Sequence, residues 1–307
     1  MDVVPPLTLL VTTGYILTLF FNFQAGVGPN SDLSLGLFRS SIGNLSNLYP
    51  TPVTPAGYTF AIWGLIYSWF AAWLVYVITT LFRTNDKGPV YLNPPTTSPA
   101  FLIAVFLNLT FNVTWLFAFD RTTFILSQVA LVGITVTLYI AVSIATSRVY
   151  EYLFVFKEYG VFDLWANRVL VQNGLALYAT WTTVATKVNL SIVLIYTFGV
   201  DKETTTYICF AVLATQLVTY FLLDCFVYDR YFRYILIVYP AALWSLGGIL
   251  VANVRDPTSP QAVIGSTLFA IVFVFFVIKT ILVIIRNPVY IIAKQEKADG
   301  IAYSRMV

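Results

Sequence analysis

The chain has 307 residues, of which 59% are hydrophobic and 10% are charged, and its formal net charge is +3. Soluble domains contain about 25% charged residues, so this composition excludes a soluble globular protein and also a disordered one. The absence of histidine excludes His-based catalytic triads and His-ligated metal sites, and the small net charge gives no indication of nucleic-acid binding. We therefore predict an all-α, polytopic membrane helix bundle.

Eight segments are long and apolar enough to cross a bilayer, which takes about 20 residues per helix. The predicted spans are residues 5–23, 57–81, 100–119, 122–146, 169–186, 206–227, 231–251 and 263–285. A further apolar stretch at 191–198 is too short to cross, so we expect it to extend the fifth helix or to lie at the interface. If it did cross, nine spans would place the two termini on opposite sides.

The basic residues are distributed unevenly between the two sides of this bundle. With eight spans, eleven Lys and Arg residues lie on the side of both termini and five lie on the other side. The positive-inside rule then predicts that both termini, including the short basic tail 287–307, are cytoplasmic. The long first loop, residues 24–56, faces the other side and carries a glycosylation sequon at Asn44.

Three predicted spans combine polar side chains with large aromatic ones at membrane depth, and on each span their spacing places them on one helix face. These residues are Phe60, Trp63 and Tyr67 in the second span, Asn108, Asn112 and Trp115 in the third, and Trp181 and Asn189 in the fifth. An unpaired asparagine is costly in hydrocarbon, so these faces should point toward protein or a cavity. The alternative is that the asparagines join helices and the tryptophans form an interfacial belt.

These motifs resemble those of the TspO/MBR family, the tryptophan-rich sensory and translocator proteins. The shared features are a proline followed by Trp-x-x-x-Tyr in the second helix, Asn-x-x-Trp in the third, and a Trp eight residues before an Asn in the fifth. In this chain they are Pro55 with Trp63 and Tyr67, then Asn112 with Trp115, then Trp181 with Asn189. The resemblance covers residues 1–192 and implies a five-helix bundle with a long first loop. Residues 193–286 would add three helices that short members of the family lack.

The resemblance also implies a function, namely the binding, transport or sensing of a planar hydrophobic ligand such as a tetrapyrrole or a sterol. Trp63, Tyr67, Trp115 and Trp181 would stack on the ligand, and Asn112 would fix its orientation. Phe60 and Asn189 belong to the same predicted site. Because the chain lacks histidine and has methionine only at positions 1 and 306, a porphyrin would be held without axial ligation of its iron.

Two charged residues, Asp224 in the sixth predicted span and Lys279 in the eighth, are candidates for charges within the membrane. Lys279 lies seven residues before Arg286 near the end of the last span, and we favour the interpretation that its side chain extends to the cytoplasmic headgroups. An intramembrane ion pair between Lys279 and Asp224 is the alternative. Asp224 itself is expected to join an interfacial network with the charged residues at 229, 230 and 233.

Three classes of function remain open at this stage. The first is the ligand-binding protein just described, the second is a non-catalytic accessory or structural subunit of a membrane complex, and the third is a transporter of small solutes. An enzyme is not expected, because no nucleophile–base pair, metal cluster or phosphate loop is evident. We predict no bound cofactor, and as partners we predict the lipid bilayer, a porphyrin-like or sterol-like molecule, and either further copies of the chain or another membrane protein.

Overall fold

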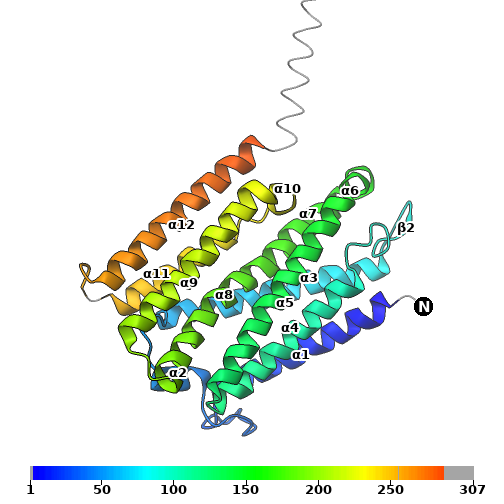
Figure 1. Cartoon of the computed structure of the whole chain (residues 1–307). Coiled ribbons are helices and arrows are strands. Elements are labelled where there is room, and N and C mark those ends of the chain that lie inside the picture. The colour runs from blue at the N-terminus through cyan, green and yellow to red at the C-terminus, as the bar shows by residue number, and fades with distance from the viewer. Residues whose placement is uncertain (1–2, 255, 287–307) are drawn as a thin grey trace, which may run out of the picture.

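Long helices that run side by side make up most of the chain (Figure 1). The computed structural model describes residues 3–254 and 256–286, so the predicted tail 287–307 lies outside the described residues. The longest helices are α1 (Val4–Val27), α3 (Ile62–Phe82), α4 (Pro99–Asp120), α5 (Phe124–Glu151), α8 (Asn173–Ile192), α9 (Lys202–Leu222), α11 (Val238–Asn253) and α12 (Pro260–Ile285). These eight correspond in order to the eight predicted spans.

Shorter elements join or extend these helices. They are the helices α2 (Ile42–Leu48), α6 (Leu153–Tyr159), α7 (Val161–Ala166) and α10 (Asp229–Phe232), the 3-10 turn η1 (Gly57–Ala61), the π-helical segments η2 (Asn167–Gln172), η3 (Val193–Thr197) and η4 (Leu223–Val227), and a two-stranded hairpin of β1 (Thr84–Asn85) and β2 (Gly88–Pro89). Because η3 follows α8 directly, the apolar stretch at 191–198 extends the fifth long helix. It is not a ninth span.

Local sequence explains where several helices begin. α4 and α12 each start with a serine followed by a proline, and the hydroxyls of Ser98 and Ser259 accept hydrogen bonds from backbone amides three residues later. Asp201 caps α9 in the same way. A side-chain oxygen at this position satisfies an amide that has no partner within the helix, and proline tolerates the first turn because it has no amide to satisfy.

The seventh long helix begins later than predicted, at Val238 and not at residue 231. The reason lies in α8, where the Asn173 side chain accepts hydrogen bonds from the amides of Leu236 and Ile237 and donates one to the carbonyl of Tyr234. The amides and the carbonyl that bond to Asn173 are backbone groups that a continuous helix would pair with each other along its own axis. The result is the break between α10 and α11.

Six of the eight long helices are long and apolar enough to cross a membrane, and the exceptions are α8 and α11. α11 is an apolar helix of only 16 residues. α8 is less apolar because it lies at the centre of the bundle, where 16 of its 20 residues are buried. In α12, by contrast, 5 of 26 residues are buried, and the remainder is almost entirely apolar. A helix surrounded by protein can carry polar residues that a lipid-facing helix cannot.

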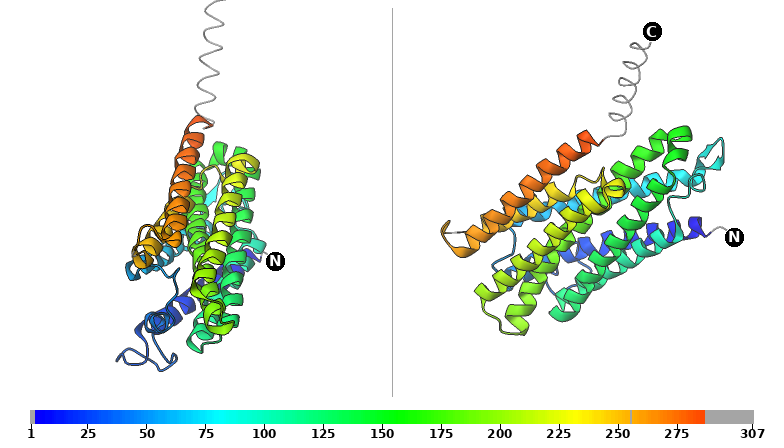
Figure 2. Two further views of the ribbon diagram at one scale, coloured as in Figure 1. Left: turned by 60° about the vertical axis from the view of Figure 1, so that its left-hand side comes forward. Right: turned by 45° about the horizontal axis from the view of Figure 1, so that its top comes forward.

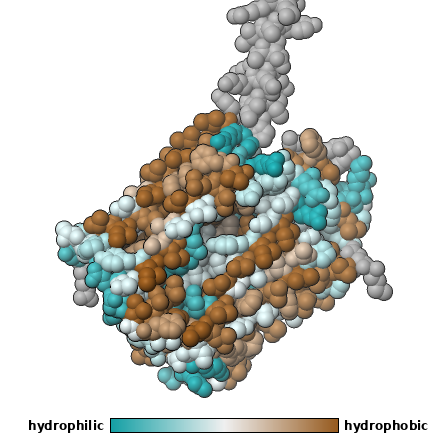
Figure 3. Space-filling model, in the orientation of Figure 1, coloured by the Kyte–Doolittle hydropathy of each residue, from teal (hydrophilic) through white to brown (hydrophobic). Residues whose placement is uncertain are grey.

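Two views of the bundle agree on which elements lie at each of its two ends. The start of α1 and the end of α12 lie at the same end of the bundle, whereas α2 and the first loop lie at the opposite end (Figures 1 and 2). An even number of crossings produces this arrangement. On the face shown in Figure 3, hydrophobic residues cover most of the length of the helices and hydrophilic ones gather mainly toward the two ends, as expected for a multi-pass integral membrane protein.

Candidate functional site

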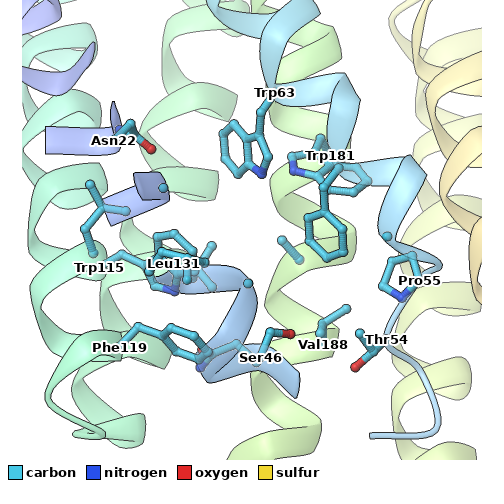
Figure 4. Close-up of a pocket in the computed structure, with 18 of the residues that line it drawn as sticks. Asn22, Ser46, Thr54, Pro55, Trp63, Trp115, Phe119, Leu131, Trp181 and Val188 are labelled. Carbon is cyan, nitrogen blue, oxygen red and sulfur yellow. The ribbon is translucent and has the colours of Figure 1, made fainter. Parts of the chain in front are cut away.

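A cavity of about 680 Å³ lies between α1, α2, α3, α4 and α8, near the end of the bundle that carries the first loop (Figure 4). Its volume falls in the range that is usual for small-molecule sites. Six of the seven residues predicted to bind a ligand line it, namely Phe60, Trp63, Tyr67, Trp115, Trp181 and Asn189. Among the described lining residues none is Asp, Glu, Lys or Arg.

Aromatic rings from three helices form the walls of this cavity. Trp63 stacks on Tyr67 one turn later, with ring centroids 5.5 Å apart and planes 19° apart. Trp181 of α8 meets Trp63 edge-on at 6.1 Å and 86°. On the other wall, Trp115 stacks on Phe119 of the same helix at 5.5 Å. The two walls therefore present aromatic faces and edges toward one space, which suits a planar apolar guest.

Asn112 does not line the cavity but lies behind its wall, where it is fully buried. Its amide group donates to the hydroxyls of Tyr178, at 2.7 Å, and Tyr67, at 3.3 Å, and its oxygen accepts from Asn22 at 2.8 Å. It thus joins α1, α3, α4 and α8 at membrane depth. This position differs from the predicted direct contact with a ligand, because Tyr67 and Asn22 stand between Asn112 and the cavity.

The other two asparagines of the sequence pattern also connect helices. Asn108 does not share the surroundings of Asn112, since its amide donates to the carbonyl of Ile134 in α5 at 3.0 Å. Asn189 borders the cavity, but its side chain is already bonded to Ser127 and Gln128, each at 3.0 Å. For Asn108 and Asn189 the structure agrees with the alternative interpretation, in which the asparagines form hydrogen bonds between helices.

The first loop covers the mouth of the cavity. α2 contributes Ser46 and Asn47 to the lining, and its exposed residue Asn44, the predicted glycosylation position, lies on the same short helix. The loop is attached to α4 by Asp120, whose buried carboxylate accepts hydrogen bonds from the amides of Arg39, at 2.8 Å, and Ser40, at 3.1 Å. Asp120 therefore positions the cover of the cavity without lining it.

The segment that leads into α3 is held from outside the first five long helices. The carbonyl of Gly248 in α11 accepts from the amide of Ala56 at 3.0 Å, and the indole of Trp244 donates to the carbonyl of Thr59 at 3.0 Å. α11 passes so close here that a Cβ added at Gly248 would lie 2.5 Å from the hydroxyl of Thr59. α11 thus supports the wall of the cavity that contains Pro55 and Phe60.

Sequence reasoning missed the lining residues from α1 and from the first loop, which include Asn22, Phe23, Ser46 and Thr54. Asn22 had a usable signal, because it is a polar residue near the end of an otherwise apolar span. The loop residues had none, since their position depends on how the loop folds back over the bundle.

Comparison with known families adds an independent observation. A model of the family described as TSPO-like protein matches residues 8–281. The chain belongs to this TSPO-like family. Searches of curated proteins and of solved structures returned no match.

The TSPO-like match extends well beyond residue 192, where the sequence motifs end, and includes α9, α11 and most of α12. The structure agrees, because Val184 of α8 packs in one hydrophobic cluster with residues of α9, α11 and α12. The division of the chain at residue 192 stays a prediction, but the later helices are part of the TSPO-like pattern.

The favoured interpretation of Lys279 is wrong. Its side chain does not extend to the headgroups but is fully buried and paired with Asp224, whose side chain is also fully buried. The Lys279 ammonium group also donates to the carbonyl of Phe232 at 3.2 Å, and Asp224 accepts from the hydroxyl of Tyr239 at 2.7 Å. Asp224 is therefore not part of the interfacial network, in which Asp229 binds Arg233 at 2.6 Å.

Proposed function

We propose that this TSPO-like protein binds a planar hydrophobic molecule of the tetrapyrrole or sterol class in the cavity beneath the first loop. The observation that carries the proposal is the lining itself, in which aromatic rings of three helices surround one space and no described lining residue is charged. Such a lining disfavours a buried charge on the ligand, because an unpaired charge in an apolar site is costly. It favours a neutral ligand, or one whose charged groups extend toward the loop.

Two of the polar lining residues favour one orientation of the ligand. Ser46 and Thr54 lie at the loop end of the cavity, whereas Trp63 lies at the deeper end (Figure 4). A ligand with one polar end would place it near the loop, and its apolar body would contact Trp63 and Trp181. We include in the proposal that the ligand is bound without chemical change. We also include that the end of the bundle that holds the start of α1 and the end of α12 faces the cytoplasm, as the positive-inside rule favours.

The test is a binding titration of the purified full chain in lipid nanodiscs with protoporphyrin or a sterol, followed by tryptophan fluorescence. Trp63→Ala and Trp115→Ala are each expected to weaken binding at least about fivefold, because one aromatic contact contributes about 1 kcal/mol beyond its buried area. Trp165→Ala is the matched control, since Trp165 lies on α7 outside the lining and is 46% exposed.

The result that would contradict this site is unchanged affinity in Trp63→Ala and Trp115→Ala, with both variants as thermally stable as the parent chain. Mass spectrometry of the ligand after prolonged incubation checks the remaining part of the proposal. Recovery of unaltered ligand is expected, and a modified product would show that the chain is an enzyme.

A further inference from the structure

A second polar region, separate from the cavity, follows the inner face of α9 and η4. Thr205, Cys209, Gln216, Tyr220 and Asp224 fall within about 100° of one another around the helix axis, at 3.6 residues per turn. From the first to the last of them the helix rises about 28 Å, close to the thickness of the hydrocarbon core. Polar side chains therefore lie on this face toward both ends of α9, and the buried Leu213 separates Cys209 from Gln216.

Three of these side chains have hydrogen-bonding capacity that the protein does not use. The hydroxyls of Thr205 and Tyr220 and the side-chain oxygen of Gln216 are buried, and among the described residues they find no hydrogen-bond partner. Leaving such an atom unpaired costs about 1–3 kcal/mol. Three of them on one helix face point to a partner that is not a protein group, and a file of water molecules meets that requirement.

α8 contributes a series of linked polar groups on the side that faces α9. The thiol of Cys209 donates to the carbonyl of Lys187 at 3.5 Å, and the buried Lys187 ammonium group donates to the hydroxyl of Thr186 at 2.9 Å. One turn earlier in α8, Thr183 is hydrogen-bonded to the hydroxyl of Tyr139 in α5 at 2.6 Å. In the described part of the chain, Lys187 has no carboxylate partner, so its charge depends on dipoles or water.

At the other end of α9 the polar groups converge on the buried ion pair. The rings of Tyr220 and Tyr239 lie 5.9 Å apart, and the Tyr239 hydroxyl donates to Asp224. Lys279 binds the other carboxylate oxygen of Asp224. The titratable groups that face Asp224 are Lys279 from α12, Tyr239 from α11, Tyr220 and Cys225 from its own helix, and Asp229 from α10.

We propose that these polar groups hold a file of water and carry protons across the membrane. We call them the polar seam, and they are Thr205, Cys209, Gln216, Tyr220 and Asp224 of α9 and η4, Thr183, Thr186 and Lys187 of α8, Tyr239 of α11 and Lys279 of α12. A proton that reaches the Asp224 carboxylate neutralises it and releases Lys279. The ion pair forms again when the proton leaves for water at the end of the bundle where α12 ends. No bond other than O–H is made or broken. The hydroxyls of Tyr220 and Thr205 and the amide of Gln216 order the water between the two ends.

The experiment measures proton flux into vesicles that contain the full chain, a pH-sensitive dye and a potential imposed with potassium and valinomycin. The parent chain is expected to acidify the vesicles several times faster than protein-free lipid does. Tyr220→Phe and Gln216→Leu are each expected to slow this flux at least fivefold. Both variants should fold, because each removes a polar atom that has no hydrogen-bond partner within residues 3–254 and 256–286.

Tyr207→Phe is the matched control, because it removes a hydroxyl from the same helix outside the polar seam, where Tyr207 donates to Glu203. Its flux should equal that of the parent chain. A parent flux no faster than that of protein-free vesicles would overturn the proposal. It would also fail if Tyr220→Phe and Gln216→Leu, shown to be folded by thermal unfolding, conducted as well as the parent.

Discussion

The cavity and the polar seam both bury polar atoms at membrane depth, but they use different groups to do so. Around the cavity the polar groups are neutral, and Asn112 behind its wall is bonded to side chains of three other helices. The polar seam contains two buried lysines and a buried carboxylate, together with polar atoms that find no partner in the part of the chain that the structure describes. The comparison indicates that neutral groups shape the space for a molecule, including the indoles of Trp115 and Trp181, which find no partner among the described residues. Charges within a bundle require either each other or water.

The largest effect on stability is expected at the buried ion pair of the polar seam, Lys279 and Asp224. Lys279→Met leaves the Asp224 carboxylate buried and unpaired, which should lower the free energy of unfolding by about 3–5 kcal/mol. Combining it with Asp224→Asn removes the charge but keeps an oxygen for Tyr239, so most of the loss should be recovered. Denaturant titration in mixed micelles measures both variants. Equal destabilisation in the single and double variants would show that the pair is not coupled.

A smaller effect is expected where the later helices support the cavity. Gly248→Ala forces Thr59 away from α11 and displaces the cavity wall at Pro55 and Phe60, so ligand affinity should fall about fivefold. Gly247→Ala is the matched control, because its added Cβ would come no closer than 3.6 Å to a neighbour, Phe269. Equal affinity in the two variants, measured by fluorescence titration, would show that α11 does not support the site.

The smallest effect on stability is expected at the cover of the cavity. Asp120→Asn weakens the hydrogen bonds from Arg39 and Ser40, which a charged acceptor strengthens, and should cost about 1 kcal/mol. Hydrogen exchange at the amides of residues 39 and 40 should rise severalfold, while the exchange of α4 stays unchanged. Asp32→Asn, an exposed position in the same loop, is the control. If exchange stayed slow in Asp120→Asn, another contact would be holding the loop.

Much of the fold could be predicted from the sequence, because the apolar runs are long and their ends carry helix-capping residues. Seven of the eight long helices begin within about five residues of the predicted span. The later start of α11 could not be foreseen, since it depends on hydrogen bonds that the amides of Leu236 and Ile237 donate to Asn173, which is about 60 residues away in the chain. A local pattern carries no information about such a distant partner.

The same limit explains what was predicted of the candidate site and what was not. Helical spacing and the family motifs predicted that Trp63, Trp115 and Trp181 line one site, because each motif fixes the helix face on which its residues lie. Spacing alone could not place Asn112 behind Tyr67, which depends on how α1 packs. Nor could it pair Lys279 with Asp224, since the position of α12 follows from its packing on α9 and α11.

The central position of α8 has a consequence for how the protein is made. A helix that carries Lys187 and two asparagines is a poor substrate for insertion into lipid by itself, because charged residues at the centre of a span oppose insertion. Its polar groups are accommodated by helices that are synthesised before it, such as α5, and by α9, which follows it. We therefore expect α8 to enter the bilayer efficiently only in contact with these neighbours, so that the order of synthesis is itself a condition for folding.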